Sequence, residues 1–351
     1  MQFRGTSRAC LALLAALPAM AQSLVMSLPR QSQRAMVSQR IALTDITITY
    51  HRPLVGSRKV WGAIVPYGQV WRAGANDNTT IEFSDPVQVE GQMLAKGTYG
   101  LHMIPDKDSW RVIFSKNSTS WGSFTYEQKE DALRVTVKPS PADMHEALTY
   151  EFDDVKPDSA VVTMLWEKLA VPFRVAADNE ATLAHIKEQF RNLPAYSWDG
   201  WNDAGKWCLD TKTNLDQGLK WAERSIQIEE RFDNEMTRAG LLKELKRDSD
   251  AASARAKAME LGNAVQLYSF GRQVQLQGQK AEAMEYFRTV ARRFPEHWVG
   301  HLAKARLSVA GGDFTTALKE IQAAQVGAPE QNKSALQGLQ KRIENKEDIN
   351  G

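Results

Sequence analysis

The chain has 351 residues, a length that typically folds as two or three domains. Hydrophobic residues make up 43% and charged residues 25%, which is close to soluble globular averages and excludes a largely disordered, collagen-like or polytopic membrane protein. The formal net charge is only +2. It falls to zero without Arg4 and Arg8, so we expect no nucleic-acid partner, because binding phosphates requires a basic surface.

Residues 1–21 have the pattern of a secretory signal peptide. Arg4 and Arg8 precede an apolar run over residues 9–17, and Ala19-Met20-Ala21 fits a cleavage site between small residues. The alternatives are an ordinary helix or a membrane anchor, but the run is shorter than the ~20 residues that span a bilayer. We therefore expect a periplasmic or secreted mature protein that spans no membrane. Only Cys208 would remain, so no intrachain disulfide is expected, and its apolar surroundings predict a buried, inert thiol.

The region from about residue 37 to residue 177 shows a period of two. Apolar and polar residues alternate in short runs, which are separated by turns rich in Pro, Gly and Asp. The runs cover residues 46–50, 81–83, 110–114, 133–137, 148–152 and 160–166. This pattern predicts an antiparallel β-sandwich or barrel-like domain, which we assign to residues 22–177.

From about Asp178 the apolar period becomes helical, and residues 178–351 contain an internal repeat. Small, apolar and Pro positions recur at one constant spacing: Gly278, Ala283, Phe287 and Pro295 return as Gly312, Ala317, Ile321 and Pro329. Gly271 stands where a first helix must pack closely. The unit resembles the tetratricopeptide repeat, a helix–turn–helix of about 34 residues, and a plain helical bundle is the alternative.

Two repeats are expected at residues 266–296 and 297–330, within four helical hairpins in total. Gly218 and Ala252 are candidates for weaker copies of the repeat. A capping helix is expected from Ala335 to Ile349, because the end of a repeat array needs a polar outer face.

Several polar and aromatic strings stand out in the β-region. They are Tyr50-His51-Arg52-Pro53, Trp71-Arg72-Ala73-Gly74-Ala75-Asn76, Lys96-Gly97-Thr98-Tyr99, and Trp121-Gly122 followed by Tyr126, Asp131 and Arg134. These strings, in this order, resemble the domain-of-unknown-function family 2911 over about residues 27–177. The resemblance implies an exported β-rich domain that is sometimes joined to tetratricopeptide repeats. It implies no reaction, substrate or catalytic residue.

Two interpretations of these strings remain open. In the structural one, Arg52, Arg72 and Arg134 pair with carboxylates such as Asp77, Asp85 and Asp131, Gly74 and Gly97 supply positive φ, and Trp71 and Trp121 close the ends of the sandwich. In the functional one, a small ligand or glycan binds a site formed by Arg52, Trp71, Arg72, Asn76, Asp131 and Arg134. Arginines on loops beside aromatic rings are common in recognition sites.

Catalytic and metal-binding patterns are weak. The sequence has no Gly-x-Ser-x-Gly string and no His-Glu-x-x-His string. His51, His102 and Asp131 are candidates for an acid–base set, and His297 with His301 has metal-compatible spacing without a third ligand. We therefore predict no cofactor and no metal, and an enzyme, such as a hydrolase, is the less favoured class.

A tryptophan cluster at Trp198, Trp201 and Trp207 marks the entry to the helical region. It is explained either by packing of the first hairpin or by an aromatic groove for a peptide or glycan. The favoured function is an exported interaction or scaffold protein whose helical repeats bind a protein partner. The alternative is a β-domain that binds a small ligand or glycan.

Overall fold

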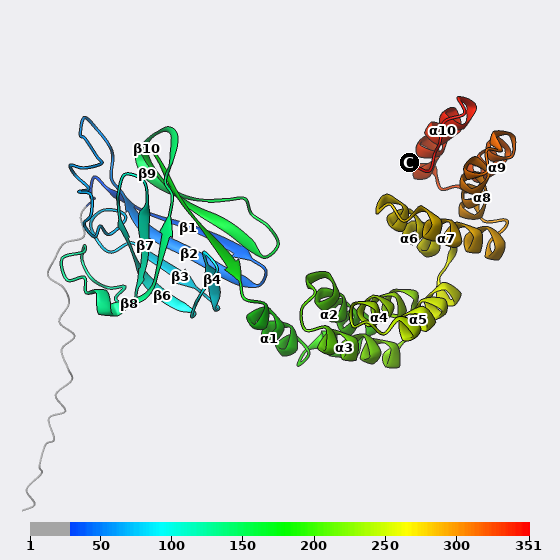
Figure 1. The fold of residues 1–351 in the computed structure, drawn as a ribbon, viewed down its shortest axis with the longest axis horizontal. Helices are drawn as coiled ribbons and strands as arrows, with labels where there is room; N and C mark the ends of the chain where they lie inside the picture. Colours follow the sequence, from blue (N-terminus) through cyan, green and yellow to red (C-terminus); the bar gives the residue numbers. More distant parts are fainter. Residues whose placement is uncertain (1–28) are drawn as a thin grey trace, which may run out of the picture. The chain divides into compact units, whose positions relative to one another are not determined.

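The computed structural model describes residues 29–351. The chain forms two compact units, with the boundary between Asp178 and Asn179 (Figure 1). The predicted signal peptide, residues 1–21, lies outside the described residues. Within residues 29–351, no helix is both long and apolar enough to cross a membrane.

The first unit is a sandwich of two antiparallel sheets. One sheet has the strand order β1-β2-β3-β6-β7-β8 and the other has the order β5-β4-β10-β9. The strands are β1 Gln33–Ile41, β2 Thr44–Arg52, β3 Thr80–Phe83, β4 Val87–Val89, β5 Gln92–Leu94, β6 Gly97–Ile104, β7 Trp110–Ser115, β8 Asp131–Val137, β9 Ser140–Asp153 and β10 Ser159–Ala177, with a short 3₁₀ turn at Gln128–Glu130.

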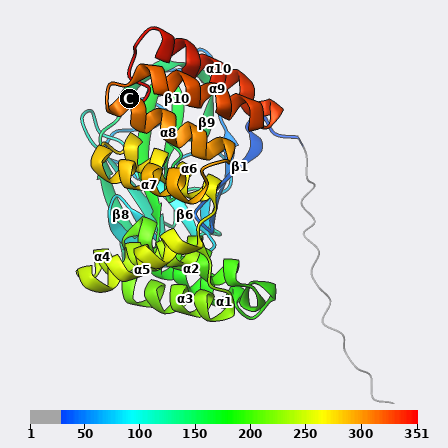
Figure 2. The same ribbon diagram turned by 90° about the vertical axis from the view of Figure 1, so that its right-hand side faces the viewer.

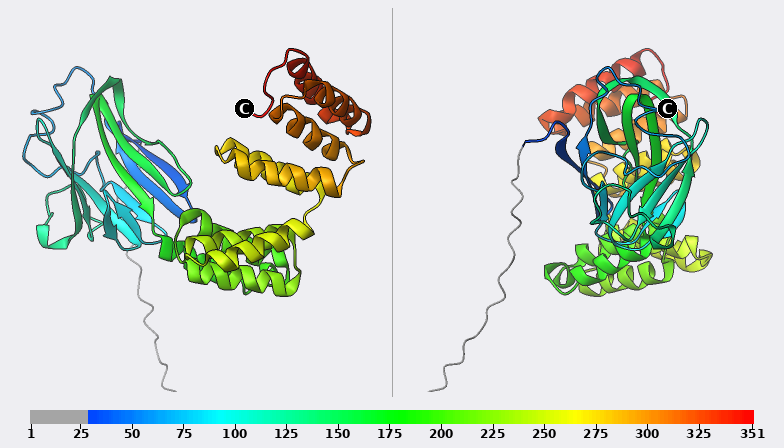
Figure 3. Two further views of the ribbon diagram at one scale, coloured as in Figure 1. Left: turned by 45° about the vertical axis from the view of Figure 1, so that its right-hand side comes forward. Right: turned by 90° about the vertical axis from the view of Figure 1, so that its left-hand side faces the viewer.

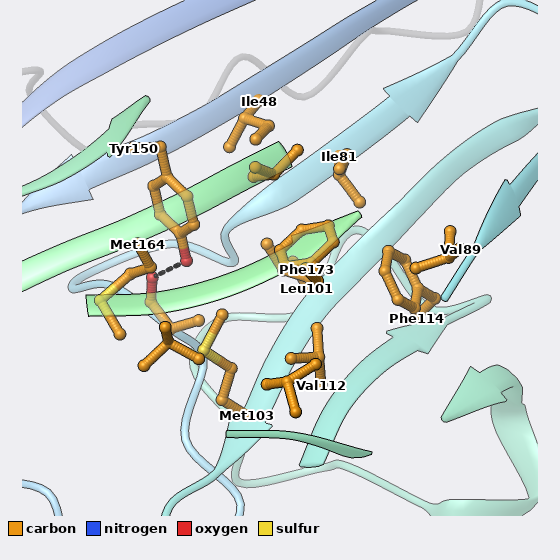
Figure 4. Packing of buried hydrophobic residues seen from close by; sticks show 14 of the residues in the cluster. Ile48, Ile81, Val89, Leu101, Met103, Val112, Phe114, Tyr150, Met164 and Phe173 are labelled. Atoms are coloured by element: carbon orange, nitrogen blue, oxygen red, sulfur yellow. Dashed lines mark hydrogen bonds between the residues drawn. The ribbon is translucent and has the colours of Figure 1, made fainter. Parts of the chain in front are cut away.

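The alternating pattern sets the core of the sandwich, because successive side chains of a strand point to opposite faces. Inward residues of both sheets pack together, among them Ile48, Leu101, Phe114 and Phe173 (Figure 4). Tyr150 is buried in this core, and its hydroxyl donates to the carbonyl oxygen of Ala73 at 2.9 Å (Figure 4). The second face of the six-stranded sheet is therefore free to carry polar residues.

The second unit is helical. Its helices are α1 Asn179–Gln189, α2 Trp198–Thr211, α3 Leu215–Ile228, α4 Phe232–Glu244, α5 Asp248–Leu261, α6 Ala264–Leu276, α7 Lys280–Arg293, α8 Trp298–Ala310, α9 Phe314–Gly327 and α10 Glu330–Glu344, with a short 3₁₀ turn at Leu193–Tyr196. The helices from α2 to α9 pack in consecutive pairs, α2 with α3, α4 with α5, α6 with α7 and α8 with α9, which form four hairpins. Figures 2 and 3 show these helices from further sides. The predicted fold class, an antiparallel β-domain followed by tetratricopeptide-like α-helical repeats, is confirmed.

The residues of the predicted repeat have clear packing roles. A Cβ on Gly271 would lie 2.8 Å from the Cβ of Tyr286, so glycine lets α6 and α7 approach closely. Ala283, Phe287, Ala317 and Ile321 are fully buried. Pro295 and Pro329 follow the ends of α7 and α9, where a residue without an amide donor interrupts a helix.

Two details differ from the sequence-based expectation. The buried counterpart of Gly218 in the second hairpin is Ala251, because Ala252, one residue later, is exposed. The capping helix α10 begins at Glu330, directly after Pro329, and ends at Glu344. It starts and ends earlier than expected because Pro329 serves as its N-cap and Lys346 adopts a left-handed φ of 57°.

Candidate functional sites

Polar residues gather on the outer face of the six-stranded sheet, opposite the core. Strand register aligns Thr49, Thr80, Gly100, Ser115 and Asp131 in a row across β2, β3, β6, β7 and β8. The neighbouring row contains His102, Ile113 and Arg134. His51 occupies an outward position two residues after Thr49 on β2. The alternation that buries Ile48 and Leu101 therefore places both histidines on the same outer face.

Two loops cover this end of the face. The amide nitrogen of Asn78, in the loop of residues 70–79, donates to the carbonyl oxygen of Asn117 at 3.2 Å. The hydroxyl of Ser123, in the loop of residues 116–127, lies 3.0 Å from Nδ1 of His102. His51 and Asn78 are 9% and 7% exposed, and His102 is only 2% exposed. We call this cluster, formed by His51, Arg72, Asn78, His102 and Asp131, the polar end of the sheet.

Three buried polar atoms at the polar end have no hydrogen-bond partner among the described residues. They are Nδ1 of His51, Nε of Arg72 and Oδ1 of Asn78. Most buried polar atoms in folded proteins are hydrogen-bonded, and leaving one unpaired costs about 1–3 kcal/mol. All three atoms lie at one end of the six-stranded sheet.

Burial also sets the protonation of both histidines. It lowers the pKa of His102 to about 4, against a smaller opposing effect of Asp131. Burial lowers the pKa of His51 too, and the cations Arg30, Arg34 and Arg72 act in the same direction, whereas Asp77, 3.7 Å away, opposes them. Both rings are therefore neutral near pH 7, and each offers one donor and one acceptor.

A tyrosine, an aspartate and an arginine form a closed network beside His102. The hydroxyl of Tyr126 donates to Asp131 at 2.8 Å, and Nε of Arg134 donates to the same carboxylate. The guanidinium of Arg134 also contacts the Tyr126 hydroxyl. Burial, followed by the Asp131 hydrogen bond, raises the pKa of Tyr126. These side chains satisfy one another, so the network holds the loop of residues 116–127 on β8.

Arg72 differs from Arg134 because no described carboxylate lies within ion-pair distance of its guanidinium. Burial lowers the pKa of Arg72, and Asp77 only partly opposes this effect. The guanidinium carbon lies 5.8 Å from the ring centre of Trp121. Trp121 stacks on Phe124 with ring centres 5.8 Å apart, and these rings are 58% and 80% exposed. An open aromatic surface thus borders a guanidinium that has no carboxylate partner in residues 29–351.

The six residues of the predicted ligand site do not form a single cluster. Arg72, Asp131 and Arg134 belong to the outer face. Arg52 points to the other sheet, where its Nε donates to the Leu148 carbonyl oxygen at 2.9 Å. Asn76 donates to the carbonyl oxygen of Ser32 at 3.2 Å.

Trp71 is packed within a cluster of four tryptophans. It stacks on Trp166 with ring centres 5.8 Å apart, and Trp61 and Trp110 complete the cluster. Its indole nitrogen donates to the carbonyl oxygen of Gly74 at 3.1 Å. Trp71 thus closes part of the sandwich, as the structural interpretation expected.

Four parts of the structural interpretation need correction, the first being Arg72, which has no carboxylate within ion-pair distance among the described residues. Trp121 is mostly exposed and closes no core. Gly74 does not adopt a positive φ, whereas Gly97 does. Glycine is needed at position 74 because a Cβ there would lie 2.5 Å from the Thr79 hydroxyl. Arg52 pairs with main-chain and hydroxyl oxygens instead of a carboxylate.

Asn78 and Phe124 are not among the residues of the ligand site predicted from the sequence. From the sequence, His51 and His102 are considered only as members of a candidate acid–base set. The available signal was register: both histidines occupy outward positions, and the outward residues that precede them on each strand are small or polar. Asn78 and Phe124 lie in loops, where no periodicity predicts the direction of a side chain.

The helical unit contains a groove of about 960 Å³. Helices α2, α4, α5, α6 and the start of α7 line it, at the step between the second and third hairpins. The first helices of successive hairpins are α2, α4, α6 and α8. The start of α4 follows that of α2 by the same number of residues as the start of α8 follows that of α6. The start of α6 follows that of α4 by two residues fewer. At this step Gly262 joins α5 to α6, and a Cβ there would lie 2.8 Å from Leu267 and 2.9 Å from Phe232.

The groove combines apolar and acidic side chains. Its lining includes the apolar residues Trp198, Phe232, Met236, Met259 and Phe270. Its acidic residues are Asp203, Asp210, Asp233, Asp248 and Glu282, against the basic residues Lys206, Lys243 and Arg255. Lys206 pairs with Asp210, and Arg255 pairs with Glu282. The other charged lining residues, Asp203, Asp233, Asp248 and Lys243, have no ion-pair partner among the described residues. Burial and the nearby Asp199 raise the pKa of Asp203.

The tryptophans at the entry to the helical unit divide between packing and the groove. Trp201 stacks on Phe190 with ring centres 3.8 Å apart and donates to the carbonyl oxygen of Ala195. Trp207 packs against the core of the first hairpin. Trp198 lines the groove. Asn202, one helical turn after Trp198, also lines the groove and has a buried Oδ1 without a partner among the described residues.

The two histidines of α8 have separate partners. Nδ1 of His301 lies 2.7 Å from Glu320, and Nδ1 of His297 accepts from the Val299 amide as the N-cap of the helix. Among residues 29–351, no group of three or more His, Cys, Asp or Glu side chains is placed to hold a metal ion.

Residues 32–175 match the family described as "Protein of unknown function (DUF2911)", which confirms the resemblance seen in the motif strings. No curated protein matches the sequence. The family description assigns no activity, so the β-domain must be interpreted from its own side chains.

Three solved structures are similar to part of the chain. One is described as the APC/C hetero-tetramer Cut9-Hcn1, with 15% identity, a TM-score of 0.30, and coverage of 47% of this chain and 32% of the other. A second is YrrB, described as a TPR protein with an unusual peptide-binding site, with 17% identity, a TM-score of 0.27 and coverage of 46% and 83%. A third is MamA, with 14% identity, a TM-score of 0.29 and coverage of 44% and 91%.

Proposed function

We propose that the protein is an exported binding protein whose helical repeats hold an extended, basic segment of a partner protein. The groove along α2 and α4 to α7 carries this proposal. Its volume of 960 Å³ is at the upper end of the range typical of ligand sites, and it continues along several helices instead of closing around a compact molecule. Helical repeats commonly present extended binding surfaces of this kind.

The chemistry of the lining favours a basic segment. Asp203, Asp233 and Asp248 have no cationic side chain within ion-pair distance among the described residues, whereas Lys243 is the one basic lining residue without an ion pair there. A lysine or arginine of the partner would supply the missing positive charge. The half-buried side chains of Met236, Met259 and Phe270 would pack against apolar side chains of the same segment.

Asn202 supports binding of a main chain. Its buried Oδ1 accepts no hydrogen bond from the described residues, although the side chain lines the groove. A backbone N–H of an extended peptide is a suitable donor for this atom, and satisfying it removes a cost of about 1–3 kcal/mol.

The test measures the affinity of the full-length chain for random-sequence peptides selected from a displayed library, followed by titration calorimetry. We expect selected peptides to be enriched in Lys and Arg, and binding to weaken at least tenfold in the double variant Asp203→Asn/Asp233→Asn. The matched control is Asp216→Asn, an aspartate on α3 outside the groove. Selection of acidic peptides, or equal affinities of the double variant and control, would refute the proposal.

Export is the second part of the proposal and is supported by the sequence of residues 1–21. Its test is the mass of the protein recovered from the cell envelope and culture medium. A mature chain that begins at Gln22 is expected. Recovery of intact chain from the cytoplasm alone would refute export without affecting the proposed groove.

A further inference from the structure

We propose that the polar end of the six-stranded sheet binds a carboxylated sugar, the chemical class of the uronic acid units in acidic polysaccharides. This inference stands on the β-domain alone and does not depend on the helical groove. Its basis is the combination of an arginine without a carboxylate partner among the described residues, buried unpaired acceptors and an exposed aromatic surface.

The arginine defines the charge of the ligand. The Arg72 guanidinium is half-buried, its Nε is unpaired, and no described carboxylate lies within ion-pair distance of it. Arg30 and Arg34 add positive potential close to His51, and the Asp77 carboxylate is exposed and shared between Arg30 and His51. A guanidinium pairs with a carboxylate through two parallel hydrogen bonds, so a monoanion suits this single arginine.

The unpaired atoms show that the ligand must also donate hydrogen bonds. The amide nitrogen of Asn78 is bound to the Asn117 carbonyl oxygen, which fixes the side chain so that its unpaired Oδ1 is an acceptor. Neutral His51 offers a further donor or acceptor at Nδ1. A sulfate dianion presents only acceptors to these groups and hydrogen phosphate has a single donor, whereas each sugar hydroxyl both donates and accepts. The chemistry therefore favours a hydroxylated monoanion over a simple inorganic anion.

The exposed rings supply the surface for a sugar ring. Trp121 and Phe124 stack with an interplanar angle of 15°, and both are open to solvent beside Arg72. Small-molecule sites typically combine an aromatic surface with a few placed polar groups, which is the combination found here. Large exposed rings that pack against no core are otherwise unfavourable on a soluble domain.

Glycines bring the two covering loops close enough to join these features. A Cβ on Gly100 would lie 2.4 Å from the Asn117 carbonyl oxygen and 2.7 Å from the Asn78 amide nitrogen. A Cβ on Gly122 would lie 3.3 Å from Nη1 of Arg72. The absence of these side chains lets Asn78, Arg72 and the aromatic pair approach one another over one end of the sheet.

The test is titration calorimetry of the full-length chain with an oligogalacturonate, with the matched uncharged oligogalactose and with inorganic phosphate. We expect the acidic sugar to bind at least tenfold more tightly than the neutral one, and phosphate not to compete at equal concentration. Trp121→Ala and Arg72→Gln should each weaken binding at least tenfold. Trp121 is 58% exposed, so its replacement is expected to leave the fold intact.

The controls are Arg111→Gln, an exposed arginine elsewhere on the outer face, and Tyr196→Ala, an exposed aromatic of the helical unit. Both should bind as the unmodified chain does. Absence of binding to the acidic sugar, equal affinity for the neutral sugar, complete displacement by phosphate, or unchanged binding in Trp121→Ala would each overturn the proposal.

Discussion

Gly278 and Gly312 occupy the same position of successive hairpins and adopt the same left-handed backbone, with φ of +85° and +77°. Each follows the first helix of its hairpin. The next amide bonds back to a carbonyl of the preceding helix, from Gln279 to Val274 and from Asp313 to Ser308. These bonds form the Schellman turn, which requires a left-handed residue and therefore favours glycine.

Lys212 and Lys246 occupy the same position in the first two hairpins. Their φ values are +54° and +63°, and the following amides, those of Thr213 and Arg247, make the equivalent bonds. A side chain with a Cβ is strained in this conformation. Across the four hairpins, the turn between the two helices is thus built twice from glycine and twice from lysine.

This relationship predicts opposite effects for two substitutions. Gly278→Ala should lower the free energy of unfolding of the helical unit by about 1 kcal/mol, and Lys246→Gly should raise it by roughly 0.5–1 kcal/mol. The measurement is urea denaturation of the full chain followed by far-UV circular dichroism. Gly338→Ala is the control, because Gly338 lies on α10 with open space around it, and alanine should stabilise there. A stabilising Gly278→Ala would contradict the assignment of the turn.

The four turns also explain how far the sequence predicts the helical unit. Glycine marks the turns at positions 278 and 312, so the last two hairpins are visible as a repeat. The turns of the first two hairpins have lysine at positions 212 and 246. They cannot be recognised from the sequence, because lysine does not indicate a left-handed backbone. The shorter interval between the starts of α4 and α6 further breaks the register, and the groove lies at this step.

In the β-domain, alternation predicts which residues face the core but leaves the loops undetermined. The strings at residues 71–76 and 121–134 contain Arg72, Asp131 and Arg134, whose role in binding a ligand stays a prediction. Arg52 was misplaced because it lies one residue beyond outward-facing His51 and therefore turns to the opposite sheet. The contact between Asn78 and Asn117 joins two loops that are distant in the sequence, which no local pattern encodes.

Arg306 is predicted to fasten the C-terminal segment onto the repeats. It is 4% exposed on α8, and its guanidinium bonds the Tyr268 hydroxyl at 2.5 Å and the carbonyl oxygen of Ile349. Asn350 completes the contact by donating to the Arg306 carbonyl oxygen at 3.0 Å. Arg306→Met leaves buried acceptors unpaired and should lower the free energy of unfolding by about 2–3 kcal/mol.

The control for this prediction is Arg288→Met. Arg288 pairs with Glu285 at 2.7 Å, but both side chains are mostly exposed, so its loss should change stability by less than about 0.5 kcal/mol. Proteolysis at the C-terminus should also be faster in Arg306→Met alone. Similar stability and similar proteolysis in the two variants would show that Arg306 does not hold the segment.

Cys208 is predicted to be unreactive in the native protein. Cys208 is fully buried against α3. A Cβ added to Gly218 on α3 would lie 2.6 Å from the Cβ of Cys208. Burial raises the pKa of the thiol to about 11, so about one molecule in a thousand carries the reactive thiolate at pH 8. A chromogenic thiol reagent should not label the Cys10→Ser chain until denaturant is added. Rapid, complete labelling of the folded chain would contradict the buried position.

His102 is predicted to make the β-domain less stable in acid. Its pKa is about 4 in the folded state, because of burial, and about 6.5 in an unfolded chain, so the unfolded state binds the proton more tightly. The contribution of neutral His102 to the free energy of unfolding is therefore fully present above pH 6.5. It is lost as the pH drops toward 4, by about 2 kcal/mol between pH 7 and pH 5. In His102→Gln this contribution is absent.

The measurement compares the free energy of unfolding of the two chains at several pH values. Because both units contain tryptophans, the β-domain is followed by the tryptophan-fluorescence transition that far-UV circular dichroism of the helical unit does not share. Other titrating groups affect both chains equally, so the difference between the two isolates His102. That difference should shrink as the pH falls from 7 to 5, since acid removes stability only from the chain that retains the histidine. A difference that stays constant over this range would mean that His102 is not held neutral beneath Ser123 and Tyr126.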